Sequence, residues 1–375
     1  MTNSAAVTYR VAAIPGDGVG PEVVAAARAV LDATGERFGF AIDWSEVAAG
    51  GNAIDSYGVA IRPEDVARCG EADAVLLGAI GGPKWDNPSA AVRPEQALFA
   101  LRGGLGLFAN LRPVKVHPAL VSSSPLRPEL LEGVDLLIVR ELTGGIYFGP
   151  RDEATGEPGR RTAQDTLPYS EEEIRRVVRL AFELAQARRG RLTSVDKANV
   201  LATSRLWRTV VEELRPEFAD VELRHQLVDS CAMLIVKRPA DFDVVVTENL
   251  FGDILSDDAS VLAGSLGMLP SASLGERRTA HGVFGLYEPI HGSAPHLAGQ
   301  DRANPIGTIL SVAMLLRWSL GHEDAASAVE SAVARTIDDG LRTADIAVGG
   351  AQAVGTTAMA RAIAERVTAP ASVAA

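Results

Sequence analysis

Two aspartates four residues apart, Asp253 and Asp257, are the strongest sign of chemistry in this sequence. They follow a short apolar run at 242–247, which predicts a buried strand, and we expect a helix to begin at Gly252. Both carboxylates would then project from one helix face near the carboxyl end of a strand. Two carboxylates together with substrate oxygens suit Mg²⁺ or Mn²⁺. The alternative is that acidic side chains near a helix start only favour the helix dipole.

Several arginines stand where an anionic ligand could meet them. Arg140 closes the apolar run 135–139, and Arg102 and Arg112 lie ten residues apart in a glycine-rich segment. A guanidinium can form two parallel hydrogen bonds with a carboxylate, so several arginines would suit a dicarboxylate. Taken alone, each arginine fits a surface or ion-pair residue better than a ligand contact, just as Tyr147 fits a packed tyrosine and Lys197 a solvated lysine. Their positions just beyond strands favour a binding site, because ligands of α/β proteins bind there.

Composition limits the class of protein. The 375 residues are 47% apolar and 22% charged, which predicts a folded chain of two lobes or one elaborate domain. The net charge of −12 argues against broad binding to nucleic acid or to an anionic membrane. The two cysteines, Cys69 and Cys231, show no disulfide or zinc spacing. With no export signal and no apolar run near about 20 residues, we expect a cytoplasmic protein without a membrane span.

The elements that must position these residues alternate between strands and helices, which is typical of an α/β fold. Apolar runs at 9–14, 72–77 and 191–195 predict strands, and 22–32 predicts a helix. The clearest helix is 170–189, where Ser170 and Glu173 form a capping box and Gly190 ends the helix. The polar segment 151–168, with its glycines and prolines, predicts an excursion from the fold or an arm.

A glycine-rich turn follows the first strand at 16–21, but it does not carry a Rossmann fingerprint. Its spacing is GxGxG rather than GxGxxG, and Pro21 starts a helix without contributing to phosphate binding. A tight turn with no function is an equally good interpretation of this segment.

Taken together, the motifs resemble the β-decarboxylating family of isocitrate and isopropylmalate dehydrogenases. The similarity runs from Ile14 to Thr343, and its specific motifs lie in the family's order at 81–85, 110–113, 140–149, 196–200, 249–257, 267–273 and 291–295. The resemblance implies a two-lobed α/β fold that lacks the Rossmann fingerprint. The large lobe, 1–107 and 264–375, would bind the cofactor. The small lobe, 108–263, would bind substrate and metal and form a homodimer, with 150–168 as its arm.

The resemblance also implies a reaction and a role for each motif residue. The reaction is the NAD-dependent oxidative decarboxylation of (2R,3S)-3-isopropylmalate to 2-oxo-4-methylpentanoate and CO₂ in leucine biosynthesis. Arg102, Arg112 and Arg140 would hold the substrate carboxylates. Mg²⁺ or Mn²⁺ would be held by Asp253, Asp257 and the partner subunit's Asp229, which also faces the substrate. Catalysis would use Tyr147 as proton donor and the partner subunit's Lys197, made neutral by cationic neighbours and the metal, as an aid to deprotonation.

Specificity and cofactor binding are likewise implied by the resemblance. Glu95, Leu98 and Val200 would surround the isopropyl group, and a hydrophobic wall of this kind discriminates only modestly between alkyl groups. The cofactor residues implied are Val19, Gly82, Glu95, Glu288, His291, Gly292, Ser293, Ala294, Pro295, His296 and Asn304.

Two departures from the family pattern affect the cofactor. His296 stands where the family's NAD enzymes carry an aspartate for the ribose hydroxyls, while Leu297, Ala344 and Val348 occupy positions where NADP enzymes bind the extra phosphate. NAD is therefore favoured. Ser230 and Leu234 replace an asparagine and a glutamine next to Asp229, which removes or shortens two polar groups.

Two other functions stay open on the sequence. One is a β-decarboxylating dehydrogenase acting on another 3-substituted malate, outside leucine synthesis. The other is an inactive homologue with a structural or regulatory role, against which the presence of every expected catalytic side chain argues.

Overall fold

The computed structural model describes residues 7–87, 89–349 and 352–369. The chain divides into two compact units, both α/β, which agrees with the expected fold class. Unit 1 comprises Met1–Leu107, His117–Ser124 and Ala263–Ala375, and unit 2 comprises Phe108–Val116 and Pro125–Leu262. The sequence-based division had placed His117–Ser124 in the small lobe, whereas the structure groups this segment with unit 1.

Five strands of unit 1 lie in the order β2-β1-β3-β12-β11. β1 pairs in parallel with β2 and with β3, β12 pairs in parallel with β3, and β11 pairs antiparallel with β12. Their bounds are Val7–Gly16 (β1), Phe40–Glu46 (β2), Ala74–Ala79 (β3), Pro270–Arg278 (β11) and Val283–Pro289 (β12). The first two runs expected to be strands are therefore strands, although β3 begins two residues later than expected.

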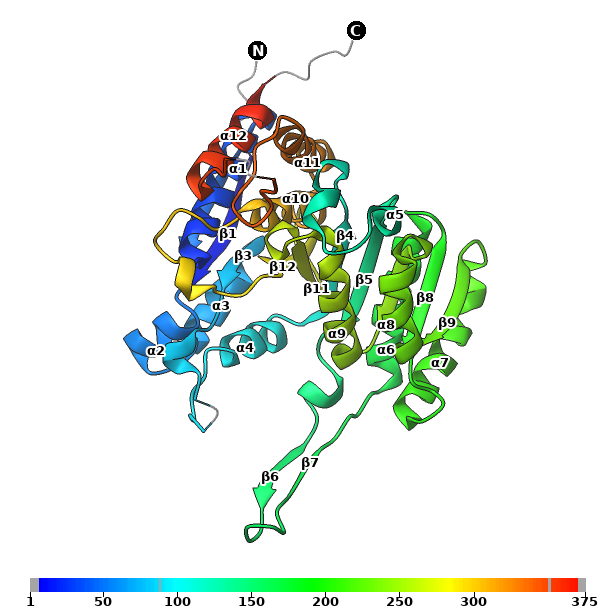
Figure 1. Ribbon diagram of the computed structural model, residues 1–375. Helices are drawn as coiled ribbons and strands as arrows, with labels where there is room; N and C mark the ends of the chain where they lie inside the picture. Colours follow the sequence, from blue (N-terminus) through cyan, green and yellow to red (C-terminus); the bar gives the residue numbers. More distant parts are fainter. Residues whose placement is uncertain (1–6, 88, 350–351, 370–375) are drawn as a thin grey trace. The chain divides into compact units, whose positions relative to one another are not determined.

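In unit 1, α1 near the start of the chain and α12 near its end pack side by side (blue and red in Figure 1). Helix α1 begins at Gly20 with Pro21 in its first turn, as the turn sequence predicts. The bounds are Gly20–Phe38 (α1), Gly51–Tyr57 (α2), Pro63–Glu71 (α3), Gln96–Gly104 (α4), Ile306–Trp318 (α10), Glu323–Asp338 (α11) and Thr356–Thr368 (α12).

Five strands of unit 2 lie in the order β4-β5-β10-β8-β9. β4 and β5 are antiparallel, while β5, β10, β8 and β9 run parallel. Their bounds are Leu107–Lys115 (β4), Asp135–Glu141 (β5), Arg191–Asp196 (β8), Glu222–Leu227 (β9) and Val244–Thr247 (β10). The parallel strands bring the residues that follow them to one edge of the sheet.

The helices of unit 2 pack in pairs, α6 with α7 and α8 with α9, and both pairs contact strands. The predicted capping box is present: Ser170 accepts from the Glu173 amide, and the Glu173 carboxylate accepts from the Ser170 amide. The helix ends at Gln186, three residues earlier than expected. The bounds are Pro128–Leu131 (α5), Glu171–Gln186 (α6), Ala202–Leu214 (α7), Val228–Lys237 (α8) and Asn249–Ser260 (α9).

The arm segment forms a two-stranded antiparallel hairpin, β6 (Arg151–Thr155) with β7 (Thr162–Asp165). Figure 1 shows it extending away from the sheet of unit 2, and every residue of both strands is exposed. A two-stranded hairpin whose residues are all exposed is marginal alone, so this hairpin is suited to contact another molecule.

Both cysteines are free and buried, in agreement with the absence of a disulfide spacing. Burial raises the pKa of the Cys69 thiol to about 12 and that of the Cys231 thiol to about 12 as well. Across the described ranges, no helix combines the length and the apolar character that crossing a membrane requires.

Candidate active site

The two aspartates lie in the middle of α9, because this helix begins at Asn249 and not at Gly252 as expected. The Glu248 carboxylate starts the helix by accepting hydrogen bonds from the Leu250 amide at 3.1 Å and the Phe251 amide at 2.8 Å. The first turn consequently holds no acidic residue. A favourable interaction with the helix dipole is therefore a weak explanation for Asp253 and Asp257, since that effect falls off within the first turn.

Arg140, at the end of β5, reaches across α9 to the first of these aspartates. Its guanidinium donates to Asn249 Oδ1 from Nε at 3.0 Å and from Nη2 at 2.8 Å, and Nη1 donates to the Asp253 carboxylate. The side chain of Arg140 is only 3% exposed. Gly252 makes this crossing possible, because a Cβ at that position would lie 2.6 Å from Arg140 Cγ.

Arg112, on β4, approaches the same carboxylates from a second strand. Nη2 lies 3.7 Å from Asp253 Oδ1 and Nη1 lies 3.5 Å from Asp257 Oδ1. Its orientation is held by Asn110, whose Oδ1 accepts from Nε at 2.7 Å, and by Ser256, whose Oγ accepts from Nη1 at 2.6 Å. Two guanidinium groups and two carboxylates therefore meet within unit 2.

Tyr147 adds an acid to this cluster. It ends a short 3₁₀ turn, Gly145–Tyr147, and its hydroxyl donates to Asp253 Oδ2 at 2.8 Å. Burial is the main cause that raises the pKa of Tyr147, and the hydrogen bond and negative charge of Asp253 add to it. The phenol consequently keeps its proton at neutral pH and is available as a proton donor.

The chemistry of the two aspartates fits a divalent cation. Partial desolvation by neighbouring groups, and then the negative charge of Asp253, raise the pKa of Asp257, while Arg112 opposes the shift. Repulsion of this kind between two carboxylates is relieved by a shared cation. In the described part of one chain no three His, Cys, Asp or Glu side chains come together as a metal site. The cluster thus offers two carboxylates, with Asp257 largely exposed at 69%.

Lys197 and Asp229 follow β8 and β9 in unit 2 and pair with each other, Nζ to Oδ1 at 2.9 Å. Hydrogen bonding by Lys197 is the main cause that lowers the pKa of Asp229. Among the described residues of one chain, the charged group that contacts Lys197 is this carboxylate. The expected cationic neighbours at a site shared with a second subunit stay a prediction. Nearby, Val200 is 62% exposed, and Ser230 accepts from Gln226 Nε2 at 2.6 Å.

The expected specificity residues of unit 1 lie on and around α4. Glu95 directly precedes this helix, and its Oε1 lies 3.4 Å from the place of a Cβ at Gly81, next to Gly82. Leu98 is half-buried. Arg102 Nη2 lies 3.7 Å from Glu288 Oε1, with both side chains 13% exposed, so an expected substrate residue adjoins an expected cofactor residue.

The glycine turn after β1 is organised by Asp17, a residue to which the sequence analysis gave no role. Its buried carboxylate accepts from the amides of Gly51 at 2.7 Å, Asn52 at 2.9 Å and Gly81 at 2.8 Å. The Val19 amide, in the same turn, donates to the Ser293 carbonyl at 2.8 Å. The turn therefore joins the segments of Gly82 and of 291–296.

His291 presents an unused acceptor. Nδ1 lies 2.9 Å from the Gly292 carbonyl, and because a carbonyl only accepts, this nitrogen carries the proton. Nε2 is then an acceptor; it is buried and has no partner among the described residues. Burial lowers the pKa of His291, so the ring is neutral. A buried acceptor without a donor fits a ligand that supplies a hydroxyl or an amide N–H, both of which a nicotinamide nucleotide carries.

The remaining expected cofactor residues differ in their exposure and in whether their polar groups already have partners within the protein. His296 is exposed in a 3₁₀ turn, Pro295–Leu297, whereas Leu297 and Ala294 pack on Val19 and its neighbours. Asn304 is buried, and its amide is used within the protein: Nδ2 donates to Asp345 Oδ2 at 3.0 Å and Oδ1 accepts from the Ile306 amide at 3.0 Å.

Sequence reasoning missed the residues that hold the arginines, namely Asn249, Ser256 and Asn110. The signal for Asn249 and Ser256 was present, since they lie four residues before Asp253 and one before Asp257 on the same helix. A local signal existed for Asn110 as well, because it lies two residues before Arg112 on β4 and the two side chains therefore share one face of the strand.

The sequence is similar to known proteins over almost its full length. The model of the isocitrate/isopropylmalate dehydrogenase family matches residues 10–363. A 3-isopropylmalate dehydrogenase of Anaeromyxobacter dehalogenans is 58% identical over 337 residues, covering 90% of this chain and 94% of that relative. One of Gloeobacter violaceus is 55% identical over 352 residues, covering 94% and 96%.

Solved structures agree with the sequence comparison. An isocitrate dehydrogenase from Methylococcus capsulatus has a TM-score of 0.84 at 34% identity and covers 96% of this chain and 100% of that one. A β-decarboxylating dehydrogenase from Thermococcus kodakarensis has a TM-score of 0.75 at 38% identity, covering 96% of each chain. With a family model and relatives above 50% identity spanning the fold and the cluster around Asp253, the chain belongs to the isocitrate/isopropylmalate dehydrogenase family.

Proposed function

We propose that the chain catalyses the NAD-dependent oxidative decarboxylation of (2R,3S)-3-isopropylmalate to 2-oxo-4-methylpentanoate and CO₂, a step of leucine biosynthesis. Relatives named for this activity are 53–58% identical over most of the chain, which places it among dehydrogenases that use a nucleotide cofactor and a metal. The structural observation that carries the proposal is the meeting of Arg112, Arg140 and Tyr147 at the two aspartates of α9.

This cluster provides the groups that a malate-type substrate requires. Arg112 and Arg140 supply guanidinium donors for two carboxylates, and each is oriented by an asparagine. Preorganised cations at these positions lower the cost of binding a dianion and stabilise the charge that develops in the reaction.

Tyr147 completes the reaction as a general acid. After loss of CO₂ the substrate is left as an enol, and we assign to the Tyr147 hydroxyl the transfer of a proton to its carbon. Its raised pKa keeps the phenol protonated, and Asp253 orients it. Lys197, from the partner subunit, assists removal of the proton from the substrate hydroxyl.

For the cofactors we propose NAD and Mg²⁺ or Mn²⁺. When bound, NAD accepts the hydride and the cation stabilises negative charge on the 2-oxygen. The cation would be held by Asp253, Asp257 and the partner subunit's Asp229. NAD would lie along Val19, Gly82 and 291–296, where the neutral His291 offers its free acceptor.

We propose a homodimer in which both subunits contribute to each site. The described part of α8 and α9 exposes apolar side chains that a monomer would not need: Met233 is 65% exposed, Ile254 51% and Val236 43%. The two helices pack on each other, so their exposed faces can form one surface, and the β6–β7 hairpin offers a second. A cytoplasmic location remains a prediction from the sequence.

Initial rates with a panel of 3-alkyl malates, each with NAD or NADP and with Mg²⁺ or Mn²⁺, test the function. The highest kcat/KM is expected for 3-isopropylmalate with NAD, followed closely by malates of similar alkyl size. A preference for a different 3-substituent would replace the proposed substrate, and no turnover with any of them would favour an inactive homologue.

A further inference from the structure

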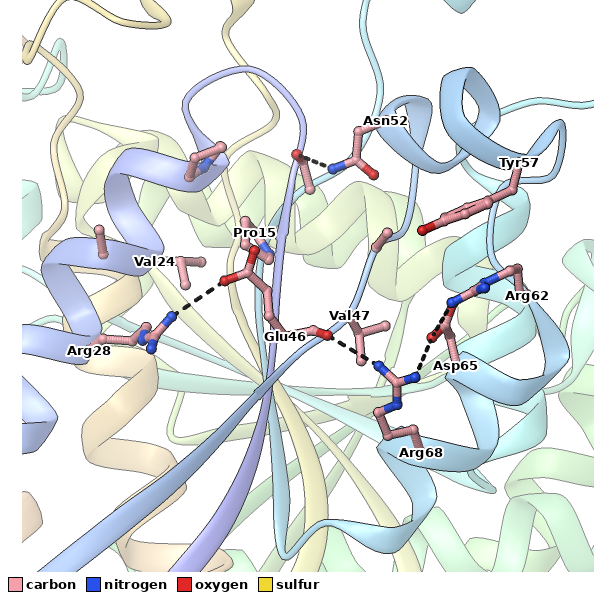
Figure 2. A pocket seen from close by; sticks show the side chains of 14 residues that line it. Pro15, Val24, Arg28, Glu46, Val47, Asn52, Tyr57, Arg62, Asp65 and Arg68 are labelled. Atoms are coloured by element: carbon pink, nitrogen blue, oxygen red, sulfur yellow. Dashed lines mark hydrogen bonds and ion pairs between the residues drawn. The ribbon is translucent and has the colours of Figure 1, made fainter.

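The charged side chains of the pocket between α1 and α3, in unit 1, balance one another. Figure 2 shows its arginines beside Glu46 and Asp65. The pairs are Arg28–Glu46, Arg62–Glu64, Arg62–Asp65 and Arg68–Asp65, at 2.7 to 3.6 Å. Three guanidiniums therefore face three carboxylates, and the pocket offers no surplus charge that would select a ligand.

Unit 2 contains a buried charged group of a different kind, in which two carboxylates meet at one hydroxyl. The Tyr169 hydroxyl donates to Glu141 Oε2 at 2.9 Å, and Glu248 Oε2 lies 3.4 Å from the same oxygen. This oxygen also accepts from the Asn249 amide at 3.0 Å. Glu141, Glu248 and Asn249 are 0%, 5% and 1% exposed. Loss of the hydroxyl would therefore leave a buried amide without its acceptor and two carboxylates without the donor between them.

On one side, Tyr169 holds the turn that carries Tyr147. Its partner Glu141 accepts from the Gly144 amide at 2.8 Å. The Tyr169 ring lies directly against this turn, because a Cβ at Gly144 would be 2.5 Å from Tyr169 Cε1 and one at Gly145 would be 2.7 Å from its hydroxyl oxygen. Gly145 begins the 3₁₀ turn that ends with Tyr147.

On the other side, Tyr169 holds the start of α9, the helix that carries Asp253. It accepts from the Asn249 amide, and Asn249 Nδ2 in turn donates to the Gly144 carbonyl at 3.1 Å. The turn and the helix start are thus joined to each other through Tyr169 and Asn249. The contact of Tyr147 with Asp253 depends on how these two segments are placed.

The Tyr169 hydroxyl is a donor to the protein and not to a substrate. Burial is the main cause that raises the pKa of Tyr169, and the negative charges of Glu141 and Glu248 add to it. The phenol therefore stays protonated at neutral pH. Its hydrogen bonds are taken up by Glu141 and Asn249, so any effect on the reaction has to pass through the residues that it holds.

We propose that Tyr169 is a positioning residue for the protonation step, because it fixes the turn of Tyr147 against the start of α9. The inference rests on the proposed function, in which Tyr147 protonates the enol carbon. A displacement of about 1 Å can cost on the order of 100-fold in rate, so a phenol that fixes the proton donor has a measurable effect. Hydride transfer does not use Tyr147 and should be spared.

Two rates of the full-length enzyme with Mg²⁺ separate these steps. Stopped-flow appearance of NADH from 3-isopropylmalate and NAD reports hydride transfer. Exchange of a hydrogen on carbon 3 of 2-oxo-4-methylpentanoate for deuterium, with NADH present and CO₂ absent, reports the protonation step, because the acid that protonates this carbon removes the same proton in reverse. In Tyr169→Phe the exchange should slow by about 10- to 100-fold, whereas NADH appearance and the KM for substrate should change by less than about threefold.

A double-mutant cycle and a matched control show whether the effect passes through Tyr147. In the Tyr147→Phe background, Tyr169→Phe should slow the exchange by less than about twofold further. Tyr287→Phe removes another buried hydroxyl, which contacts Ser319 Oγ at 2.7 Å in unit 1, and should leave both rates unchanged. Equal slowing of hydride transfer and exchange in Tyr169→Phe, or an undiminished effect in the Tyr147→Phe background, would overturn the proposal.

Amide hydrogen exchange followed by mass spectrometry tests the positioning without turnover. Peptides that cover 143–148 and 248–251 should exchange faster in Tyr169→Phe and as in the wild type in Tyr287→Phe. Unchanged exchange in both segments of Tyr169→Phe would show that Tyr169 does not hold them. A wild type that neither oxidises 3-isopropylmalate nor exchanges the carbon-3 hydrogen would overturn the proposed function and the role in protonation with it, while faster amide exchange would still show that Tyr169 holds the turn and the helix start.

Discussion

At the scale of single residues, Asp253 is the carboxylate on which Arg112, Arg140 and Tyr147 converge. One carboxylate accepts from Arg140 and from Tyr147 and lies 3.7 Å from Arg112. It remains 34% exposed, so a cation can still reach it. The negative charge of Asp253 therefore holds the cluster together before any ligand binds. Once a cation binds, the carboxylate would serve as a metal ligand.

Asp253→Asn should lower kcat by about 100-fold or more while leaving the fold intact, because it removes a charge that both the cation and Arg140 require. Steady-state rates across a titration of Mg²⁺ or Mn²⁺, with circular dichroism for the fold, provide the measurement. Asp258→Asn removes the same charge from the same helix outside the cluster and should be nearly neutral. Full wild-type activity after chelation would show that no metal is used.

Tyr147→Phe should slow product formation by roughly 100- to 10,000-fold, while substrate and cofactor still bind, because only an acid is removed. Since the pKa of Tyr147 is raised above its ordinary value of 10, this group should cause no loss of wild-type activity as pH rises through neutrality. Single-turnover kinetics and ligand binding would be compared for both proteins. Unchanged turnover would show that Tyr147 only packs in the fold and does not donate a proton in the reaction.

His296→Asp should strengthen selection for NAD over NADP. An aspartate accepts from both ribose hydroxyls and repels a 2′-phosphate, whereas histidine offers one acceptor and, once protonated, attracts the phosphate. The measurement is the ratio of kcat/KM for the two cofactors, in the wild type and in the variant. A ratio that does not respond to the substitution would place His296 away from the ribose.

At the scale of elements, two features allow α9 to form the site: the helix starts at Asn249, and it has no side chain at Gly252. Glu248 begins it early enough that Asn249, Asp253 and Ser256 share the face that meets the arginines. Gly252 leaves the space that Arg140 crosses. The helix therefore positions the arginines as much as the aspartates.

Gly252→Ala should displace Arg140, since a new Cβ would lie 2.6 Å from its Cγ. We expect a loss of about 1–3 kcal/mol in the free energy of unfolding and a higher KM for the dicarboxylate. Urea unfolding and steady-state kinetics measure the two effects. The control Gly103→Ala lies in α4 where an added Cβ meets nothing within 4 Å, so its stability should be unchanged or slightly higher. Equal behaviour of the two variants would contradict this account.

At the scale of the whole molecule, the residues assigned to one reaction are spread over both units, and unit 2 carries exposed apolar helices and an exposed hairpin. Within one chain, Lys197 pairs with Asp229. If each site takes these two from the partner subunit, activity depends on the dimer and not on the folded chain alone.

Subunit mixing tests this dependence. Lys197→Met and Asp253→Asn should each be inactive as homodimers, but a heterodimer of the two would contain one site without either change. Random exchange of equal amounts should then restore roughly a quarter of wild-type activity, because half of the dimers are mixed and each has one working site.

Mixing Asp253→Asn with Asp257→Asn provides the control, since both changes fall on the same side of the proposed shared site and no intact site can form. Mass spectrometry of the mixtures verifies exchange. If mass spectrometry shows heterodimers of Lys197→Met and Asp253→Asn but no activity is recovered, the two subunits do not share the site as proposed.

The sequence by itself determined those features whose causes are local. The capping box of α6 and the pairing of Asp253 with Asp257 on one helix face depend on spacings of three and four residues, and both are present. The alternation of apolar runs predicted the α/β class for the same reason. Helix ends were placed less well, because Glu248 starts α9 through a side-chain contact that competes with simple propensity.

Only the tertiary structure decided which distant residues meet. Tyr147 lies 106 residues from Asp253 along the chain, and Arg112 lies 145 from Asp257. They meet because parallel pairing sets Arg140 on β5 opposite Thr247 on β10, so that α9 begins beside the end of β5. Such pairing is set by long-range hydrogen bonds and packing, to which the spacing of residues in one segment gives no access.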